Sequence, residues 1–130
     1  MIDRRELGAI FLGGAAGALA RAVLVEIYGD PAPGWPWVTF GVNVAGALLL
    51  GYLVTRLQER LPLSTYRRPF LATGFCGALT TFSTMQVELL KMLEAGRIGT
   101  ALGYGAGSVL AGYAGVQLAS AAVRRLRLQA

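Results

Sequence analysis

Residues 74–85 read GFCGALTTFSTM, and they lie inside a mostly apolar stretch that runs from about residue 69 to residue 93. The quoted twelve residues include three threonines, one serine and two glycines. Hydrocarbon cannot satisfy an unpaired polar group, so polar residues at membrane depth indicate either contacts between helices or a function. Whether this stretch spans a membrane depends on the rest of the chain.

The composition of the chain is that of a membrane protein. Of its 130 residues 55% are apolar and 15% are charged, with a mean hydropathy of +0.54. Soluble domains contain roughly 45–50% apolar and about 25% charged residues. The excess lies in four segments, each near the ~20 residues that span about 30 Å of hydrocarbon. These segments are about 7–28, 37–55, 69–93 and 98–121. We predict an all-α protein with four transmembrane helices in a single integral membrane domain, residues 1–130.

The first segment also has features of a secretory signal, because Arg4 and Arg5 precede an apolar run. It is longer than the apolar region of a signal peptide, it contains Arg21, and three more spans follow. These features favour a helix that is retained in the mature protein.

Basic residues gather at the predicted helix ends and give the chain a net charge of +5. Nine lie on the side of the termini and the 56–69 loop, and two, Lys91 and Arg97, lie on the other side. This imbalance predicts termini in the cytoplasm and contact with anionic lipid rather than with nucleic acid. The chain has no histidine and one cysteine, Cys76, which excludes His/Cys metal sites and disulfides within one chain.

Small residues recur every fourth position in the fourth segment. In lipid, such a stripe allows helix backbones to approach closely, so we predict close helix packing along it. The stripe consists of Gly99, Gly103, Gly107, Ala111, Gly115 and Ala119.

Polar residues occur within all four segments. The first contains Arg21, the second Thr39 and Asn43, the third a Thr/Ser cluster with Glu88, and the fourth Tyr104 and Ser108. Thr39 and Asn43 are four residues apart on one helix face, and so are Tyr104 and Ser108. Most of these groups are neutral hydrogen-bond donors, which suits the passage of a small, strongly hydrated anion. The alternative is that they only bridge neighbouring helices.

The third segment is longer than a span requires, at about 37 Å if it is fully helical. Gly74, Gly77, Thr80 and Thr81 favour local unwinding near residues 75–80. Unwound carbonyls at this depth need protein or an ion to satisfy them, and a sodium ion suits such a site.

Four motifs cover essentially the whole chain and closely resemble the Fluc (CrcB) family of bacterial fluoride channels. They are GGAAGALAR (13–21), GVNVAGALLLG (41–51), GFCGALTTFST (74–84) and the glycine-rich fourth segment with Tyr104 and Ser108. The resemblance implies a multi-pass protein of the bacterial inner membrane that exports fluoride passively and protects the cell from its toxicity. It also implies an antiparallel, dual-topology homodimer. Gly77 and Thr80 carbonyls of both subunits would then hold a central sodium ion that is structural and not transported.

The same resemblance implies roles for individual side chains along the fluoride pathway. Asn43 would donate to the ion, and Phe82 would face it with its ring edge. The rest of the implied pathway comprises Ser83, Thr84, Tyr104, Ser108, Thr39 and Glu88, with Arg21 near a vestibule.

The chain departs from the family pattern in two respects. Met85 stands where the family has a second phenylalanine, and a thioether lacks the positive ring edge that an anion would meet. The nine-to-two imbalance of basic residues also conflicts with insertion in both orientations.

Two other functions remain open from the residues alone. A small four-helix proton-coupled drug exporter would need an embedded acid, for which Glu88 is the candidate. A non-transport membrane assembly subunit would use all its polar residues as contacts between helices. An enzyme is not indicated, because the sequence shows no nucleophile and base pair, paired carboxylates or metal-ligand cluster.

Overall fold

The computed structural model describes residues 3–29, 34–59 and 66–128, and all its regular elements are helical. The parts of two predicted loops at 30–33 and 60–65 lie outside the described residues. The elements are α1 (Arg4–Tyr28), α2 (Trp37–Glu59), η1 (Pro69–Cys76), α3 (Gly77–Leu79), α4 (Phe82–Glu94) and α5 (Ile98–Leu128). Within the described part of the chain, three helices are long and apolar enough to cross a membrane: Arg4–Tyr28, Trp37–Arg56 and Ile98–Leu126.

The helices extend beyond the predicted apolar segments into charged sequence. α1 begins at Arg4 because Asp3 caps it, the Asp3 carboxylate accepting from the Arg5 amide at 2.9 Å. α2 and α5 continue to Glu59 and Leu128, past the predicted ends at 55 and 121. The prediction located the apolar part of each helix, whereas the backbone hydrogen bonds continue wherever the flanking residues tolerate a helix.

The third segment is divided, as predicted, but the break lies at Thr80 and Thr81, and residues 75–79 of the predicted unwound stretch are helical. The chain is π-helical over η1, forms one α-helical turn in α3, and then becomes extended, with ψ 151° at Thr80 and φ −143° at Thr81. Thr81 then caps α4, its hydroxyl accepting from the Thr84 amide. Neither half is long enough to span a membrane alone, and the segment consists of two helical pieces joined by extended backbone.

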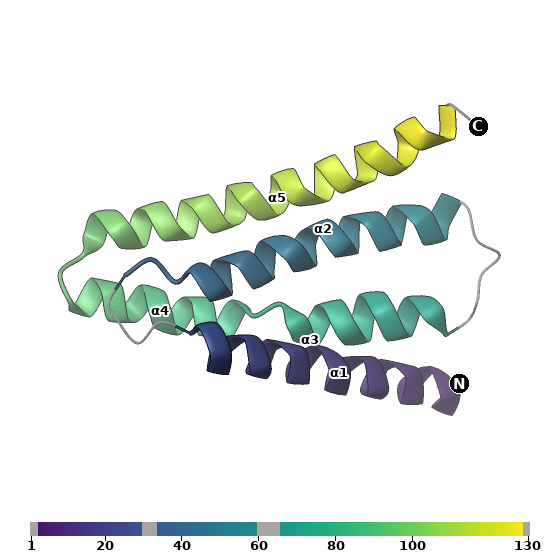
Figure 1. Ribbon diagram of the computed structural model, residues 1–130, viewed down its shortest axis with the longest axis horizontal. Coiled ribbons are helices and arrows are strands. Elements are labelled where there is room, and N and C mark those ends of the chain that lie inside the picture. Colours follow the sequence, from purple (N-terminus) through teal and green to yellow (C-terminus); the bar gives the residue numbers. More distant parts are fainter. Residues whose placement is uncertain (1–2, 30–33, 60–65, 129–130) are drawn as a thin grey trace.

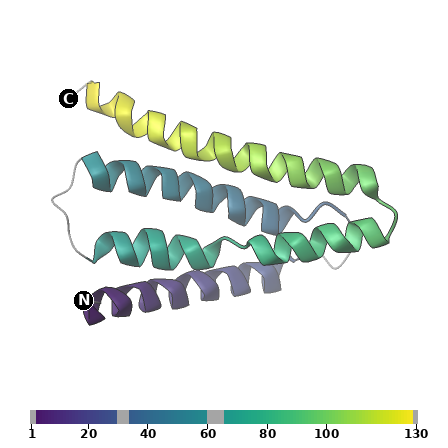
Figure 2. The same cartoon turned by 180° about the vertical axis from the view of Figure 1, so that it is seen from behind.

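The helices lie roughly parallel or antiparallel, and both termini are at one end of the molecule (Figure 1). α5 runs alongside α2, and α1 packs against η1 and α3, an arrangement also visible from behind (Figure 2). α4 packs against the first half of α5. The predicted placement of both termini on one side is confirmed.

Glycines allow α1 to pack directly on the backbone of η1. A Cβ added at Gly13 would collide with the Phe70 carbonyl, and one at Gly17 would collide with the Phe75 carbonyl. From the other side, a Cβ at Gly74 would meet the Ile10 carbonyl at 2.5 Å. Only residues without a side chain permit this spacing.

α2 and α5 pack through one end of the small-residue stripe. At Gly115 a Cβ would lie 3.3 Å from Leu48 of α2, so close packing is confirmed there, whereas at Gly99 it would meet nothing within 4 Å. Further along, the Thr55 hydroxyl donates to that of Ser120 at 2.9 Å, a buried polar link between the two helices.

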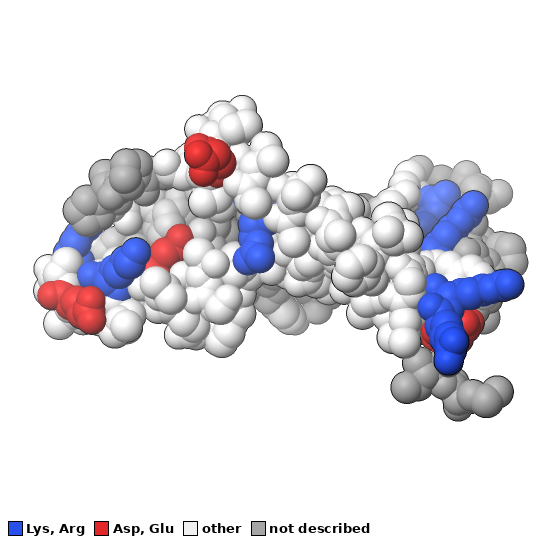
Figure 3. Space-filling view, turned by 90° about the horizontal axis from the view of Figure 1, so that it is seen from below, with Lys and Arg blue, Asp and Glu red and all other residues white. Residues whose placement is uncertain are grey.

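The surface has the charge distribution of a membrane protein. Charged side chains gather mainly at the two ends, and most of the face between them is uncharged (Figure 3). Large apolar side chains are exposed along this middle part, including Phe11 at 74% and Leu19 at 70%. Such exposure suits lipid or a partner subunit rather than water.

Candidate ion pathway

Asn43 of α2 holds the break in the third segment. Its Oδ1 accepts from the Thr81 amide at 2.8 Å, and its Nδ2 donates to the Thr81 carbonyl at 3.1 Å. One side-chain amide thus satisfies both backbone groups of a residue that lies between two helices. This pairing accounts for an extended backbone at membrane depth.

The hydrogen bonds at the break divert two amides from regular helical partners. In a continuous α-helix the Thr81 amide would donate to the Gly77 carbonyl, but here it donates to Asn43. Likewise, in a continuous α-helix the Thr84 amide would donate to the Thr80 carbonyl, but here it donates to the Thr81 hydroxyl at 3.1 Å. The two carbonyls that the resemblance implies as ion ligands are therefore those whose usual donors are engaged elsewhere.

A second polar group centres on Glu88 of α4. Its Oε1 accepts from the Thr39 hydroxyl at 2.6 Å, and its Oε2 accepts from the Tyr104 hydroxyl at 2.7 Å. Thr39 and Tyr104 are buried, at 4% and 0% exposure. The carboxylate thereby links α2, α4 and α5 in the interior of the protomer. Both hydroxyls direct their hydrogens to Glu88, which sequence reasoning did not anticipate.

Phe82 and Met85 occupy different environments although they are only three residues apart. Phe82 is 70% exposed, whereas Met85 is 7% exposed. Met85 packs in a buried cluster with Met92, Ala101 and Tyr104. Met85, at the position where the family resemblance led us to expect a phenylalanine, therefore faces the core of the molecule.

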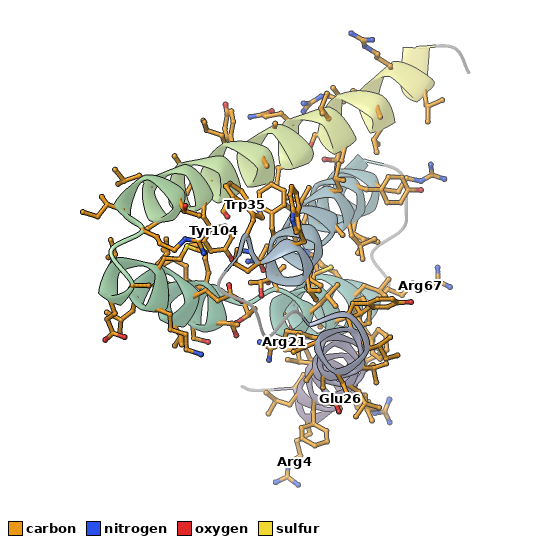
Figure 4. The ribbon with its side chains drawn as sticks, turned by 60° about the vertical axis from the view of Figure 1, so that its left-hand side comes forward. Arg4, Arg21, Glu26, Trp35, Arg67 and Tyr104 are labelled. Carbon is orange, nitrogen blue, oxygen red and sulfur yellow. The ribbon has the colours of Figure 1, made fainter. Side chains whose placement is uncertain are left out.

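The remaining predicted residues lie around these two groups. The Thr81 hydroxyl donates to that of Thr84 at 2.9 Å and lies 3.4 Å from that of Ser83. Ser108 lies one helical turn beyond Tyr104, and its hydroxyl is buried with no hydrogen-bond partner among the described residues. Arg21 is partly buried on α1 (Figure 4).

Trp35 lies two residues before the first residue of α2, Trp37. In the structure it packs edge-on against Tyr104, with ring centroids 5.5 Å apart. The small-residue stripe was the signal that could have indicated this contact, because Gly103 and Gly107 leave room for the indole ring.

A groove of about 480 Å³ opens beside the break, between α2, α5 and the third segment. Its lining includes Asn43, Gly77, Thr80 and Phe82. The carbonyl-bearing residues and the exposed phenylalanine thus share one open face of the protomer.

The described residues contain no cluster of three or more His, Cys, Asp or Glu side chains able to hold a metal.

The fold and these polar groups define a small multi-pass membrane protein with a broken third segment and a polar track. The polar track consists of Thr39, Glu88, Tyr104 and Ser108. Comparison with known proteins identifies the class further. The family model described as "CrcB-like protein, Camphor Resistance (CrcB)" matches residues 8–120. The chain therefore belongs to the CrcB family.

Curated relatives are similar over nearly their whole lengths. The protein named "Fluoride-specific ion channel FluC 1" from Mycolicibacterium paratuberculosis is 60% identical over 98% of this chain and 96% of its own. A protein of the same name from Mycobacterium bovis is 59% identical over the same shares. "Fluoride-specific ion channel FluC 2" from Nocardia farcinica is 42% identical over 95% of this chain and 88% of its own.

Proposed function

We propose that this chain forms a fluoride-selective channel that exports fluoride passively across the bacterial membrane. The observation that carries the proposal is the Asn43-held break beside Phe82, in a family member whose close relatives are named as fluoride-specific channels. The second hydrogen of the Asn43 amide is available to an ion, since one donates to Thr81. The edge of the exposed Phe82 ring adds a second, weakly positive contact.

The Glu88 network modifies the predicted pathway. Because Thr39 and Tyr104 both donate to Glu88, their hydroxyls can donate to fluoride only if they leave the carboxylate. The proposed pathway therefore runs first along Asn43, Phe82 and the Thr/Ser cluster.

The open groove supports assembly with a second copy of the chain. A lone protomer leaves Phe82 and Gly77 exposed at the break. A second copy packed on this groove would cover both residues and enclose the ion. We assign the assembly as an antiparallel homodimer with the ion path at its interface.

A structural sodium ion fits the same interface. The Gly77 and Thr80 carbonyls are hard oxygen ligands whose usual amide donors are diverted. Carbonyls from two protomers would supply four such ligands. The sodium would fix the break without being transported.

Fluoride efflux from proteoliposomes tests the function. We expect fluoride to leave much faster than chloride, and Phe82→Ala to slow it about tenfold, the effect of losing about 1.4 kcal/mol at one contact. Phe11→Ala is the matched control, because Phe11 is equally exposed but lies on α1.

Equal fluoride and chloride efflux would refute the channel. Transport that required a proton gradient and Glu88 would favour a proton-coupled exporter. Loss of folding together with flux in Phe82→Ala would favour an assembly subunit.

A further inference from the structure

Trp35 covers the part of the polar track nearest the connection between α1 and α2. It precedes α2, and its ring packs edge-on against Tyr104 and Phe40, with centroid separations of 5.5 and 5.7 Å. Figure 4 shows Trp35 and Tyr104 in the same space beside α5. The indole therefore lies next to the residue that donates to Glu88.

The indole ring of Trp35 packs against two glycines of α5, Gly103 and Gly107. A Cβ at Gly107 would lie 3.5 Å from Cη2 and 3.7 Å from Cζ2 of Trp35, and one at Gly103 would lie 3.7 Å from Cζ3. At these positions the stripe of small residues receives a side chain instead of another helix backbone. The indole ring therefore packs against this part of α5 at van der Waals distance.

Two buried polar atoms near this contact have no partner among the residues described. They are Nε1 of Trp35 and Oγ of Ser108. Cζ2, which contacts Gly107, is two bonds from Nε1, and Gly107 precedes Ser108 in the chain. Both atoms therefore lie near the same turn of α5.

Buried polar atoms nearly always form hydrogen bonds, so this unpartnered pair is a candidate site for a small bound group. An indole nitrogen can only donate, and a serine hydroxyl can also donate. The neighbouring hydroxyls of Thr39 and Tyr104 already donate to Glu88. The Trp35 N–H and the Ser108 O–H are thus the two donors here that are not already engaged, and they could donate to a small acceptor.

We propose that the Trp35 N–H and the Ser108 O–H together bind a fluoride ion next to the connection between α1 and α2. The identity of the ion rests on the proposed function, and water is the other small acceptor of the same chemistry. Trp35 would then be both the cover of the track and a direct contact for the ion.

Tryptophan fluorescence tests this site directly, because the chain contains only two tryptophans. Trp37→Phe leaves Trp35 as the sole fluorophore, and Trp37 is 70% exposed and outside the proposed site. Titration of the purified variant with sodium fluoride should give a saturable change in Trp35 emission. Sodium chloride at equal ionic strength should give none, and it keeps the sodium concentration constant.

Two further variants make the result specific to the donor pair. Ser108→Ala in the same background should weaken the apparent fluoride affinity about tenfold, as expected for one lost hydrogen bond to an anion. Trp35→Phe, which keeps Trp37 as the fluorophore, should show no fluoride response. In proteoliposomes Trp35→Phe should slow fluoride efflux about tenfold, whereas Trp37→Phe should conduct at the wild-type rate.

A Trp37→Phe protein that conducts fluoride but shows no fluoride-dependent Trp35 emission would overturn the proposal and assign the site to water. This measurement does not depend on the folding of a Trp35 variant, because Trp35 is retained. Absence of fluoride efflux in the wild-type protein would instead refute the proposed function itself.

Discussion

Glu88 is the acceptor for two buried hydroxyls that come from other helices. These hydroxyls belong to Thr39 of α2 and Tyr104 of α5. A hydrogen bond to a carboxylate stabilises a fold more than one between neutral groups. Thr39 should therefore contribute more to stability than a threonine bonded to another hydroxyl.

Two matched substitutions in α2 test this difference. Thr39→Val removes a bond to a carboxylate, and Thr55→Val removes a bond to the Ser120 hydroxyl, both at buried positions. We expect unfolding free energy to fall by about 1.5–3 kcal/mol for Thr39→Val and by about 0.5–1.5 kcal/mol for Thr55→Val. Thermal unfolding in detergent measures both, and equal losses would show that the Glu88 carboxylate adds nothing.

Met85 shows how burial alters the interpretation of a single residue. It lies with Met92 and Tyr104 in the core, so its flexible thioether fills space there. Phe82, by contrast, exposes its ring beside the groove. In this chain Met85 is therefore a core-packing residue.

At the scale of elements, the third span depends on two neighbours. α1 approaches the backbone of η1 through glycines, and α2 supplies Asn43 to the broken backbone at Thr81. The turn between α4 and α5 is local by contrast. It is closed by Gly96 at φ +72° and by a bond from the Arg97 amide to the Met92 carbonyl at 2.8 Å.

Gly17→Ala tests the close approach of α1 to the third span. The new Cβ would collide with the Phe75 carbonyl and would lie 3.1 Å from the Leu79 amide nitrogen, neither of which is a flexible side-chain end. We expect a loss of about 1–3 kcal/mol in unfolding free energy, typical of overpacking.

Gly8→Ala is the control on the same helix, because its Cβ would meet nothing within 4 Å. It should be neutral or slightly stabilising, since alanine favours a helix over glycine by up to about 1 kcal/mol. Similar unfolding temperatures for the two variants would contradict the packing that the structure shows.

At the scale of the whole molecule, the open groove and the two charged ends bear on the proposed assembly. The groove exposes the break, and the basic residues concentrate at the end that carries the termini. The homodimer that we propose would fill the groove, whereas the charge imbalance opposes insertion of one copy in the inverted orientation.

Sodium removal tests the proposed central site. Replacing sodium with N-methylglucamine, which is too large for a cluster of carbonyls, should lower both the thermal stability of the dimer and the rate of fluoride efflux. Readdition of sodium, but not of potassium at the same ionic strength, should restore both. Stability and efflux that are indifferent to this exchange would rule out a structural sodium ion.

Topology can be measured with C-terminal reporters that are active on opposite sides of the membrane. An antiparallel homodimer requires comparable signals from both reporters. Signal from the cytoplasmic reporter alone would exclude that dimer and would leave the nine-to-two imbalance as the determinant of orientation.

The amino-acid order was enough to predict the four apolar segments, both termini on one side and a break in the third segment. Span length, hydropathy and clusters of Gly and Thr are local properties of the chain. The side-chain partners became visible in the folded chain alone: Asn43 on the Thr81 backbone, Thr39 and Tyr104 on Glu88, and Trp35 on Gly103 and Gly107. These contacts join residues far apart in the chain, and their geometry depends on how closely the helices pack.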